Sequence, residues 1–337
     1  MKPLVSILMP AYNAEATIAE ALQSAVAQTW QRKEIIVIDD GSTDRTAEIA
    51  RSFNGKNVRV VSTENRGMCE AVNLASRLGQ GDYFQELDSD DILAPDKIER
   101  QLAALRLGDS KRTLLSSPWA PFFYRTRGSH FVQNSLCQDL SPAEWLLRKM
   151  AGNLHMQNAG WLVSRELASA AGPWDTQLHY DQDGEYFARV LVASEGTRFV
   201  PGTGVYYRAS GSKSISYLGN DKKKRESLLQ SMKLHIQYLR SLEESERVRK
   251  ACVQYMQNWY SAFYPTRPDL VAELQTMAKE LNGHLEVPRL KWKYAWLKPF
   301  LGWKAAKIVQ DTSCEMKSSC LRRFDKAMLR FEPARRS

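Results

Sequence analysis

Four short apolar runs, separated by stretches with helical spacing, occupy the first part of the chain. The runs are residues 4–9, 35–38, 58–62 and 83–87, and the helical stretches are residues 13–28, 45–53 and 68–78. Strands that alternate with helices favour right-handed crossovers and a mostly parallel sheet with helices on both faces. Because ligands of such sheets lie at the carboxyl ends of the strands, the chemistry is expected in the loops after Met9, Ile38 and Leu87.

Local signals and later periodicity complete this outline. Pro10 should end the first strand because it lacks a backbone N–H, and Asn13 should cap the helix that follows. Between about residues 110 and 210 short strands and helices are mixed. From Lys222 onward the apolar residues recur at helical spacing, which predicts a helical extension over residues 220–337.

The net charge of +9 is concentrated at the end of the chain. Residues 290–337 contain twelve Lys and Arg against four Asp and Glu, which leaves 35 against 34 for residues 1–289. Residues 290–303 interleave aromatic residues with lysines. Such a segment either lies in a membrane interface or packs on the main domain with its lysines in water, and both interpretations stay open. Nucleic-acid binding is not expected.

The cysteines and the hydropathy indicate in which cellular compartment the protein is expected. The five cysteines are odd in number and contain no Cys-x-x-Cys, so neither a disulfide framework nor a zinc site is indicated. The first residues are too short an apolar run for a signal peptide, and no long apolar run could span a bilayer. We therefore expect a cytoplasmic protein that can contact the membrane peripherally.

Three carboxylates stand directly after the fourth apolar run, where residues 87–91 read Leu-Asp-Ser-Asp-Asp. Asp88 and Asp90 on a turn can place oxygen ligands around Mg²⁺ or Mn²⁺, which also favour phosphate oxygens. Asp is also common in turns before helices, and Asp91 can cap a helix in residues 95–107. The motif is a candidate metal site, and this interpretation depends on whether the other loops carry matching residues.

A second acidic turn follows the second apolar run, where residues 39–44 read Asp-Asp-Gly-Ser-Thr-Asp. A carboxylate at a strand end can accept hydrogen bonds from a nucleobase or from ribose hydroxyls, and we assign this role to Asp40. Residues 42–44 are expected to form a turn that caps the next helix. Residues 10–13 read Pro-Ala-Tyr-Asn, and an aromatic ring at this place can stack on a base.

Together these loops resemble the inverting GT-A glycosyltransferases of family 2. That family opens with a strand ending in Pro-x-Tyr-Asn, followed by Asp-Asp-Gly-Ser-x-Asp and then Leu-Asp-x-Asp-Asp. Asn65, Gly67 and residues 81–83 also match the family's usual run. One departure is Val72, where the family often has Arg.

The resemblance implies a GT-A fold, which is a Rossmann-like, mostly parallel sheet flanked by helices. Its domain would cover residues 1–215, with a nucleotide-sugar half over about residues 1–110 and an acceptor half over about residues 111–215. The basic helical C-terminal extension would then be residues 216–337.

The resemblance also implies the site residues. The nucleotide-sugar pocket would be lined by Pro10, Ala11, Tyr12, Asp40, Arg66, Asp88 and Ser89. Asp90 would ligate a divalent metal, Mn²⁺ or Mg²⁺, together with Asp88, and Asp91 is the alternative ligand. Arg208 and Lys213 can hold the diphosphate in a loop that closes over the donor.

The family's catalytic base lies in a pair of acids beyond the metal motif. The matching stretch here is residues 181–189, which read Asp-Gln-Asp-Gly-Glu-Tyr-Phe-Ala-Arg. Asp183 falls on the base position, and Gln182 replaces the first acid of the pair. Asp181 and Glu185 are alternatives close in sequence, and helix capping explains Asp181 and Asp183 without catalysis.

The sequence therefore predicts an inverting, metal-assisted glycosyltransferase. It would move a sugar from a nucleotide diphosphate sugar, a UDP-sugar before others, to a hydroxyl of a glycan, lipid-linked glycan or similar acceptor. Non-processive transfer is expected because a Gln-x-x-Arg-Trp motif and membrane-spanning runs are absent. The alternatives are a sugar nucleotidyltransferase, which should have a Gly-rich loop after its first strand, and a non-catalytic nucleotide-sugar-binding module.

Overall fold

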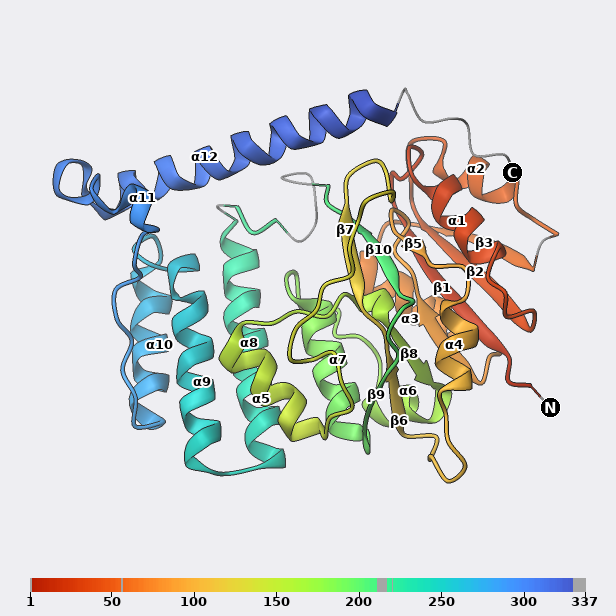
Figure 1. Cartoon of the computed structure of the whole chain (residues 1–337), viewed down its shortest axis with the longest axis horizontal. Helices are drawn as coiled ribbons and strands as arrows, with labels where there is room; N and C mark the ends of the chain where they lie inside the picture. The colour runs from red at the N-terminus through yellow and green to blue at the C-terminus, as the bar shows by residue number, and fades with distance from the viewer. Residues whose placement is uncertain (1, 56, 211–216, 220, 330–337) are drawn as a thin grey trace.

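A seven-stranded sheet forms the centre of the N-terminal part of the protein (Figure 1). The computed structural model describes residues 2–55, 57–210, 217–219 and 221–329. In spatial order the strands are β3 (Val58–Thr63), β2 (Lys33–Asp40), β1 (Val5–Ala11), β4 (Tyr83–Glu86), β8 (Trp161–Ser164), β6 (Thr113–Ser116) and β9 (Gly196–Phe199). The first four strands are parallel, and β8 runs antiparallel to both of its neighbours. The expected α/β fold with a mostly parallel sheet is confirmed.

The strand order creates a crevice between β1 and β4. The chain moves outward from β1 through β2 to β3, and then returns to the other side of β1 to form β4. Because β1 and β4 are adjacent parallel strands, the loops that leave them emerge side by side at the carboxyl ends of the strands, which is where open α/β sheets bind ligands. The loop after β1 carries Tyr12, and the loop after β4 carries the acidic residues 88–91.

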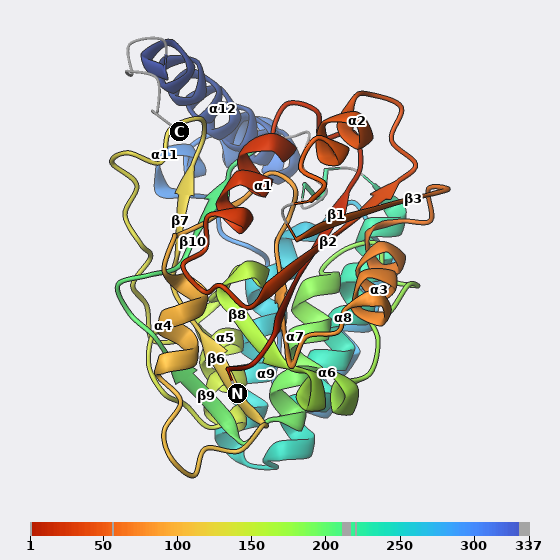
Figure 2. The same ribbon diagram turned by 90° about the vertical axis from the view of Figure 1, so that its right-hand side faces the viewer.

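Helices cover both faces of the sheet because side chains alternate along each strand (Figure 2). Ile7 and Met9 of β1 belong to one core cluster, and Leu8 belongs to the other. On the first face lie α1 (Ile18–Val26), α2 (Thr46–Arg51) and α4 (Lys97–Ala103). On the second face lie α3 (Met68–Leu78), α5 (Pro142–Gly152), α6 (Arg165–Ala171) and α7 (Gln182–Ala193).

Two small elements stand at the crevice. The first is a three-stranded sheet made, in spatial order, of β5 (Ile92–Leu93), β10 (Val205–Arg208) and β7 (Trp119–Phe122). The second is the short 3-10 helix η1 (Asn158–Gly160), which directly precedes β8. Both bring residues from the second half of the domain to the acidic loop.

The C-terminal region is helical, as expected. Its elements are α8 (Lys222–Leu242), α9 (Glu246–Trp259), the 3-10 helix η3 (Tyr260–Ala262), α10 (Pro268–Glu280), α11 (Trp292–Ala295) and α12 (Lys298–Leu329), which is interrupted at Gly302. The buried Leu228 and Met232 of α8 belong to the same core cluster as Trp161 and Phe187 of the sheet domain. The helical region and the second half of the α/β domain therefore share one core.

Two local expectations were wrong. Pro10 lies inside β1, where its missing N–H is tolerated because pairing with β4 ends at Leu8. Asn13 does not cap α1, whose N-cap is Thr17. The Asn13 side chain instead accepts a hydrogen bond from the Thr43 backbone N–H at 2.9 Å, which joins the loops after β1 and β2.

The structure also bears on the cysteines and on the expected lack of membrane-spanning runs. All five cysteines are free thiols. Within the described ranges, none of the helices combines the length and the apolar character needed to cross a bilayer.

We predict that Leu228→Ala destabilises the whole protein. Leu228 is fully buried in the shared core, so the truncation should lower the free energy of unfolding by about 2–5 kcal/mol. Chemical denaturation followed by circular dichroism measures the effect, and Leu107→Ala, at a fully exposed leucine, is the matched control. An early transition confined to the helical signal, with the rest of the protein unaffected, would contradict a shared core.

Candidate active site

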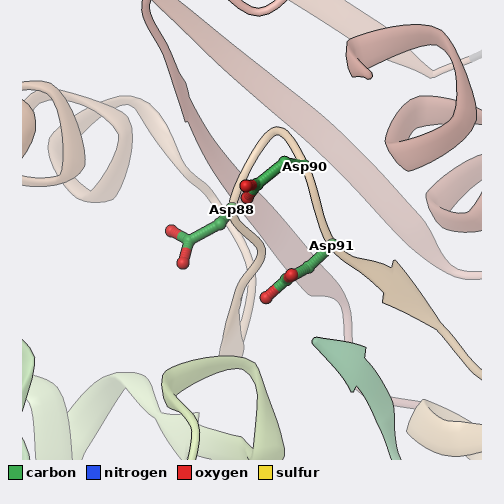
Figure 3. A group of neighbouring side chains, drawn as sticks. All are labelled: Asp88, Asp90 and Asp91. Carbon is green, nitrogen blue, oxygen red and sulfur yellow. The ribbon is translucent and has the colours of Figure 1, made fainter. Parts of the chain in front are cut away.

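The three carboxylates after β4 lie together on one turn (Figure 3). One carboxylate oxygen from each of Asp88, Asp90 and Asp91 lies within 4.8 Å of the others. Asp88 and Asp90 are partly exposed, whereas Asp91 is fully buried. The accessible pair of this cluster is therefore Asp88 and Asp90.

Each of these acids is held by a donor from the second half of the domain. Asp91 accepts hydrogen bonds from the Gln157 side chain at 2.6 Å and from the Arg208 backbone N–H at 2.8 Å. The Asn158 side chain donates to Asp88 at 3.1 Å, and the Ser210 hydroxyl donates to Asp90 at 3.0 Å. Asp91 therefore does not cap α4, which begins after Asp96; instead it fixes the base of the turn.

The electrostatics of the cluster suit a bound cation. Burial, together with the charge of Asp90, raises the pKa of Asp88 to about 7. Burial also raises the pKa of Asp90, and it raises the pKa of Asp91 well above its usual value. A divalent cation would offset the repulsion among these groups, and an all-oxygen donor set fits Mg²⁺ or Mn²⁺. The residues present therefore fit the expected metal.

Arg208 connects the elements around the acidic turn. Its guanidinium donates to the backbone carbonyl oxygen of Asp90 at 2.7 Å, to that of Phe123 at 3.1 Å and to the Glu20 carboxylate at 2.6 Å. These bonds join β10, the acidic turn and α1. A contact with a diphosphate stays a prediction, because the guanidinium is already bonded to three protein groups. Lys213, the other residue expected to hold the diphosphate, lies outside the described residues.

The residues expected at the nucleoside lie at the carboxyl ends of β1 and β2. Tyr12 is half exposed, so its ring is accessible for stacking. Asp40 is buried, and its two carboxylate oxygens accept the backbone N–H groups of Arg66 and Gly67 at 2.8 and 2.9 Å. Asp40 thus shapes the loop that presents the exposed Arg66 side chain.

The other expected pocket residues lie on the same edge of the sheet. Pro10 and Ala11 are buried at the end of β1, and Ser89 is partly buried in the acidic turn. The structure therefore brings the residues from the loops after β1, β2 and β4 to one edge. Their roles in binding stay predictions.

Asp183 acts on the acidic turn from α7. It lies in the first turn of this helix and is partly buried. Its charge contributes to the raised pKa of Asp88, which places the two carboxylates in one electrostatic environment. Burial and the charge of Asp181 raise the pKa of Asp183, while His155 and Lys149 oppose the shift. A carboxylate with a raised pKa in a crevice is suited to accept a proton.

The two sequence neighbours of Asp183 have other contacts. Glu185 is buried, and it pairs with Arg189 at 2.6 Å and accepts a hydrogen bond from the Tyr238 hydroxyl at 2.7 Å. Asp181 is the N-cap residue of α7, with a left-handed backbone, and its side chain accepts a hydrogen bond from the Ser231 hydroxyl at 2.5 Å. Among the described residues, Asp183 is the one of these acids whose carboxylate has no hydrogen bond to another side chain; the backbone N–H of Gly184 donates to it.

Sequence reasoning missed several residues of the site. Gln157, Asn158 and Ser210 hold the acidic turn, yet single polar residues far along the chain carry no spacing signal. Glu86 was missed as well, although it lies two residues before Asp88. It is buried, accepts a hydrogen bond from the Trp174 indole at 3.1 Å, and has a pKa raised well above its usual value by burial and by the charge of Asp88.

Comparison with known proteins agrees with this geometry. Residues 6–125 match the family model of glycosyl transferase family 2. The similarity to this family therefore covers about the first third of the chain, which includes the loops after β1, β2 and β4.

Particular relatives give the extent of the similarity. An uncharacterized glycosyltransferase of Rickettsia typhi is 31% identical over 192 residues, which are 57% of this chain and 60% of that protein. The chain thus spans less than two thirds of the length of this relative. In fold, the chain resembles S. aureus TarS 1–349 in complex with UDP-GlcNAc, with a TM-score of 0.62 and 18% identity over 82% of this chain and 79% of that one.

A second solved structure resembles nearly the whole chain. It is the mannosyltransferase PcManGT from Pyrobaculum calidifontis in complex with GDP-Man and Mn²⁺. The TM-score is 0.54 and the identity is 17%, with coverage of 97% of this chain and 84% of that one. At this identity the likeness concerns the fold.

We predict that Mn²⁺ stabilises the protein through the acidic turn. At a hundredfold excess over the Kd, the stabilisation should be about 2.7 kcal/mol. It should be larger at pH 8 than at pH 6, because protons compete with the metal for Asp88, whose pKa burial raises to about 7. Thermal unfolding with Mn²⁺ or with EDTA measures the effect.

Two variants test whether the turn is the binding site. Asp90→Ala should abolish the stabilisation by Mn²⁺, whereas Asp311→Ala, at an exposed acid on α12, should retain it. An equal response of both variants to the metal would show that Mn²⁺ binds elsewhere.

Proposed function

We propose that this protein is an inverting glycosyltransferase that uses a nucleotide diphosphate sugar, a UDP-sugar in the first place. One observation carries this proposal: the acidic turn stands at the carboxyl ends of β1 and β4, and Asp183 is near enough for its charge to act on Asp88 of that turn. A group that can accept a proton thus stands beside a group that can hold a metal and a diphosphate.

The proposed reaction requires one proton acceptor. Asp183 accepts the proton of the acceptor hydroxyl, while the hydroxyl oxygen bonds to the anomeric carbon and the bond from that carbon to the diphosphate oxygen breaks. Attack opposite to the leaving group inverts the configuration. Because the pKa of Asp183 is raised by burial and by Asp181, the carboxylate is a stronger base than an exposed aspartate.

Asp88 and Asp90 would hold the divalent metal, Mn²⁺ or Mg²⁺, which when bound supplies positive charge to the departing diphosphate. Asp91, buried beneath them, would keep the turn in place through Gln157 and Arg208. Tyr12 would stack on the base, and the edge around Asp40 would contact the nucleoside.

The neighbours in fold support the class of donor, since TarS was solved with UDP-GlcNAc and PcManGT with GDP-Man. We propose a hydroxyl of a glycan or a lipid-linked glycan as the acceptor, with one sugar added per encounter. A sugar nucleotidyltransferase and a non-catalytic nucleotide-sugar-binding module remain the competing functions.

The test is hydrolysis of a panel of UDP- and GDP-sugars, with Mn²⁺ or with EDTA. We expect metal-dependent release of one nucleoside diphosphate. Asp90→Ala should abolish it, and Asp183→Asn should lower kcat by about 10²–10⁴-fold, the range for a lost general base. Release of pyrophosphate from a nucleoside triphosphate and a sugar phosphate would favour a nucleotidyltransferase. Binding of a nucleotide sugar without turnover, by a folded protein, would favour the binding module.

We also propose that the basic segment that begins at residue 290, called the basic tail below, contacts a membrane peripherally, on the cytoplasmic face. The side chains of Trp292, Trp296 and Phe300 are 80%, 64% and 79% exposed, and lysines stand between them in the sequence. Trp and Phe favour the interface of a bilayer, and lysines favour anionic lipid.

The tail also packs on the rest of the protein, and this packing is compatible with membrane contact. At the near end, the Trp303 indole donates to the carbonyl oxygen of Pro288 at 2.6 Å. At the far end, Asp325 pairs with Arg125 at 2.8 Å, and α12 reaches the α/β part (Figure 1). The tail is thus anchored at both ends, while Trp292, Trp296 and Phe300 stay exposed.

We predict that the protein sediments with phosphatidylglycerol vesicles and not with phosphatidylcholine vesicles. Raised salt should weaken binding because it screens the lysines. The triple variant Trp292→Ser, Trp296→Ser, Phe300→Ser should lose most of the binding, and Leu107→Ser, at another exposed apolar residue, should keep it. Equal sedimentation of both variants would contradict a membrane role for the tail.

A further inference from the structure

One face of α8 presents a row of buried polar side chains. Ser227, Ser231 and His235 recur every four residues, so they lie above one another on the helix. Their neighbours Leu228 and Met232 pack in the apolar core. Because buried polar groups need hydrogen-bond partners, this row has to face polar groups of another segment.

That segment is the loop of residues 179–184, which leads into α7. The Ser227 hydroxyl accepts the backbone N–H groups of His179 and Tyr180 at 2.8 and 3.0 Å and donates to the carbonyl oxygen of Tyr180 at 3.1 Å. One turn further along α8, Ser231 donates to the side chain of Asp181.

His235 continues the row and brings in α5. Its Nδ1 lies 2.8 Å from the carbonyl oxygen of Ser231, so Nδ1 carries a proton. Burial lowers the pKa of His235 to about 4, so the ring is neutral at pH 7 and Nε2 is an acceptor. The ammonium of Lys149 lies 2.9 Å from Nε2 and donates to it. The carbonyl oxygen of Gly184 lies 3.0 Å from the same Nε2. Because an unprotonated Nε2 cannot donate to this oxygen, His235 supports the loop by packing against Gly184 and by holding the ammonium of Lys149, not by a hydrogen bond of its own to the loop.

The loop depends on this support because its backbone is unusual. Asp181 has φ of 59°, in the left-handed region that few residues other than glycine adopt. A Cβ on Gly184 would lie 2.1 Å from a carboxylate oxygen of Asp181, so a larger residue here would displace the Asp181 side chain, which is bonded to Ser231. Asp183 stands between these two residues, and its place follows from theirs.

We propose that the polar face of α8, made of Ser227, Ser231 and His235, together with Lys149 of α5, positions Asp183 for proton transfer. These four are positioning residues, since none of them has to touch the substrate. The C-terminal helices are then a functional part of the active site rather than an appended segment. The inference rests on the proposed function, in which Asp183 is the base.

Lys149 has a second effect, on the charge state of the base. The titratable groups that interact with the charge of Asp183 come from several elements. They are Asp181 and Tyr180 on its own loop, His155 before η1, Lys149 on α5, Cys69 on α3, Glu86 at the end of β4 and Asp88 in the acidic turn. Among them Lys149 lowers the pKa of Asp183. Removal of its charge should raise that pKa, so that the base is protonated, and inactive, up to a higher pH.

The experiment separates donor binding from turnover. With full-length protein, UDP binding in the presence of Mn²⁺ is measured by calorimetry, and hydrolysis is measured with the best UDP-sugar of the panel. His235→Ala and Ser231→Ala should lower kcat at least tenfold, because a small displacement of a reacting group costs this much or more. The Kd for UDP and the KM for the donor should change less than twofold. His284→Ala, at an exposed histidine, is the control.

The pH profile adds a readout that general damage to the fold would not move. Lys149→Met should shift the acidic limb of kcat to higher pH, and Lys149→Arg should restore it. Lys250→Met, at an exposed lysine of α9, should leave the profile unchanged. A shift in the same direction in Lys149→Arg as in Lys149→Met would overturn the assigned role of the charge.

Hydrogen exchange keeps the inference distinct from the proposed function. In His235→Ala, peptides covering residues 179–184 should exchange faster, while peptides of β1 and β4 should be unchanged. If native protein turns over no donor but the exchange changes as expected, the function is wrong and the support of the loop stands. If kcat and exchange both match those of the native protein in His235→Ala and Ser231→Ala, the inference is overturned.

Discussion

Repulsion among three carboxylates at the end of β4 is the constraint on which the site depends. Asp88, Asp90 and Asp91 lie within 4.8 Å of one another, and burial makes their charges costly. The turn is held because η1 and β10 supply amide, hydroxyl and backbone donors to all three acids. A bound cation would remove the remaining repulsion. The acceptor half of the domain is thus needed to build the metal site, although its residues lie far along the chain.

The same dependence recurs at the proposed base. Asp183 follows directly on a left-handed residue at the start of α7, and α8 holds this segment through hydrogen bonds of Ser227 and Ser231 and through the contact of His235 with Gly184. The shared core, to which Leu228 and Trp161 both belong, fixes α8 against the α/β part. Packing in the helical region therefore helps to fix the position of Asp183. Substitutions that disrupt the shared core should also disturb the geometry of the site.

Much of the fold could be predicted because its signals are local. Apolar runs and helical spacing placed β1 to β4 and the helices between them within a few residues of their bounds, and α3 was predicted at its observed bounds. The ends were less predictable, because tertiary contacts decide them. Asn13 left its expected cap position to accept the N–H of Thr43, and Pro10 stayed inside β1 because β4 no longer pairs there.

The sequence by itself determined the α/β class, the edge of the sheet where chemistry lies, and the acids after β2, β4 and before α7. These follow from periodicity and from motifs within single loops, which need no knowledge of distant contacts. Only the tertiary structure decided which acids are accessible, that Arg208 joins the acidic turn to α1, and that His235 contacts Gly184, the residue after Asp183. Those relations depend on distances between residues separated by 50 or more positions, which crossovers and core packing set.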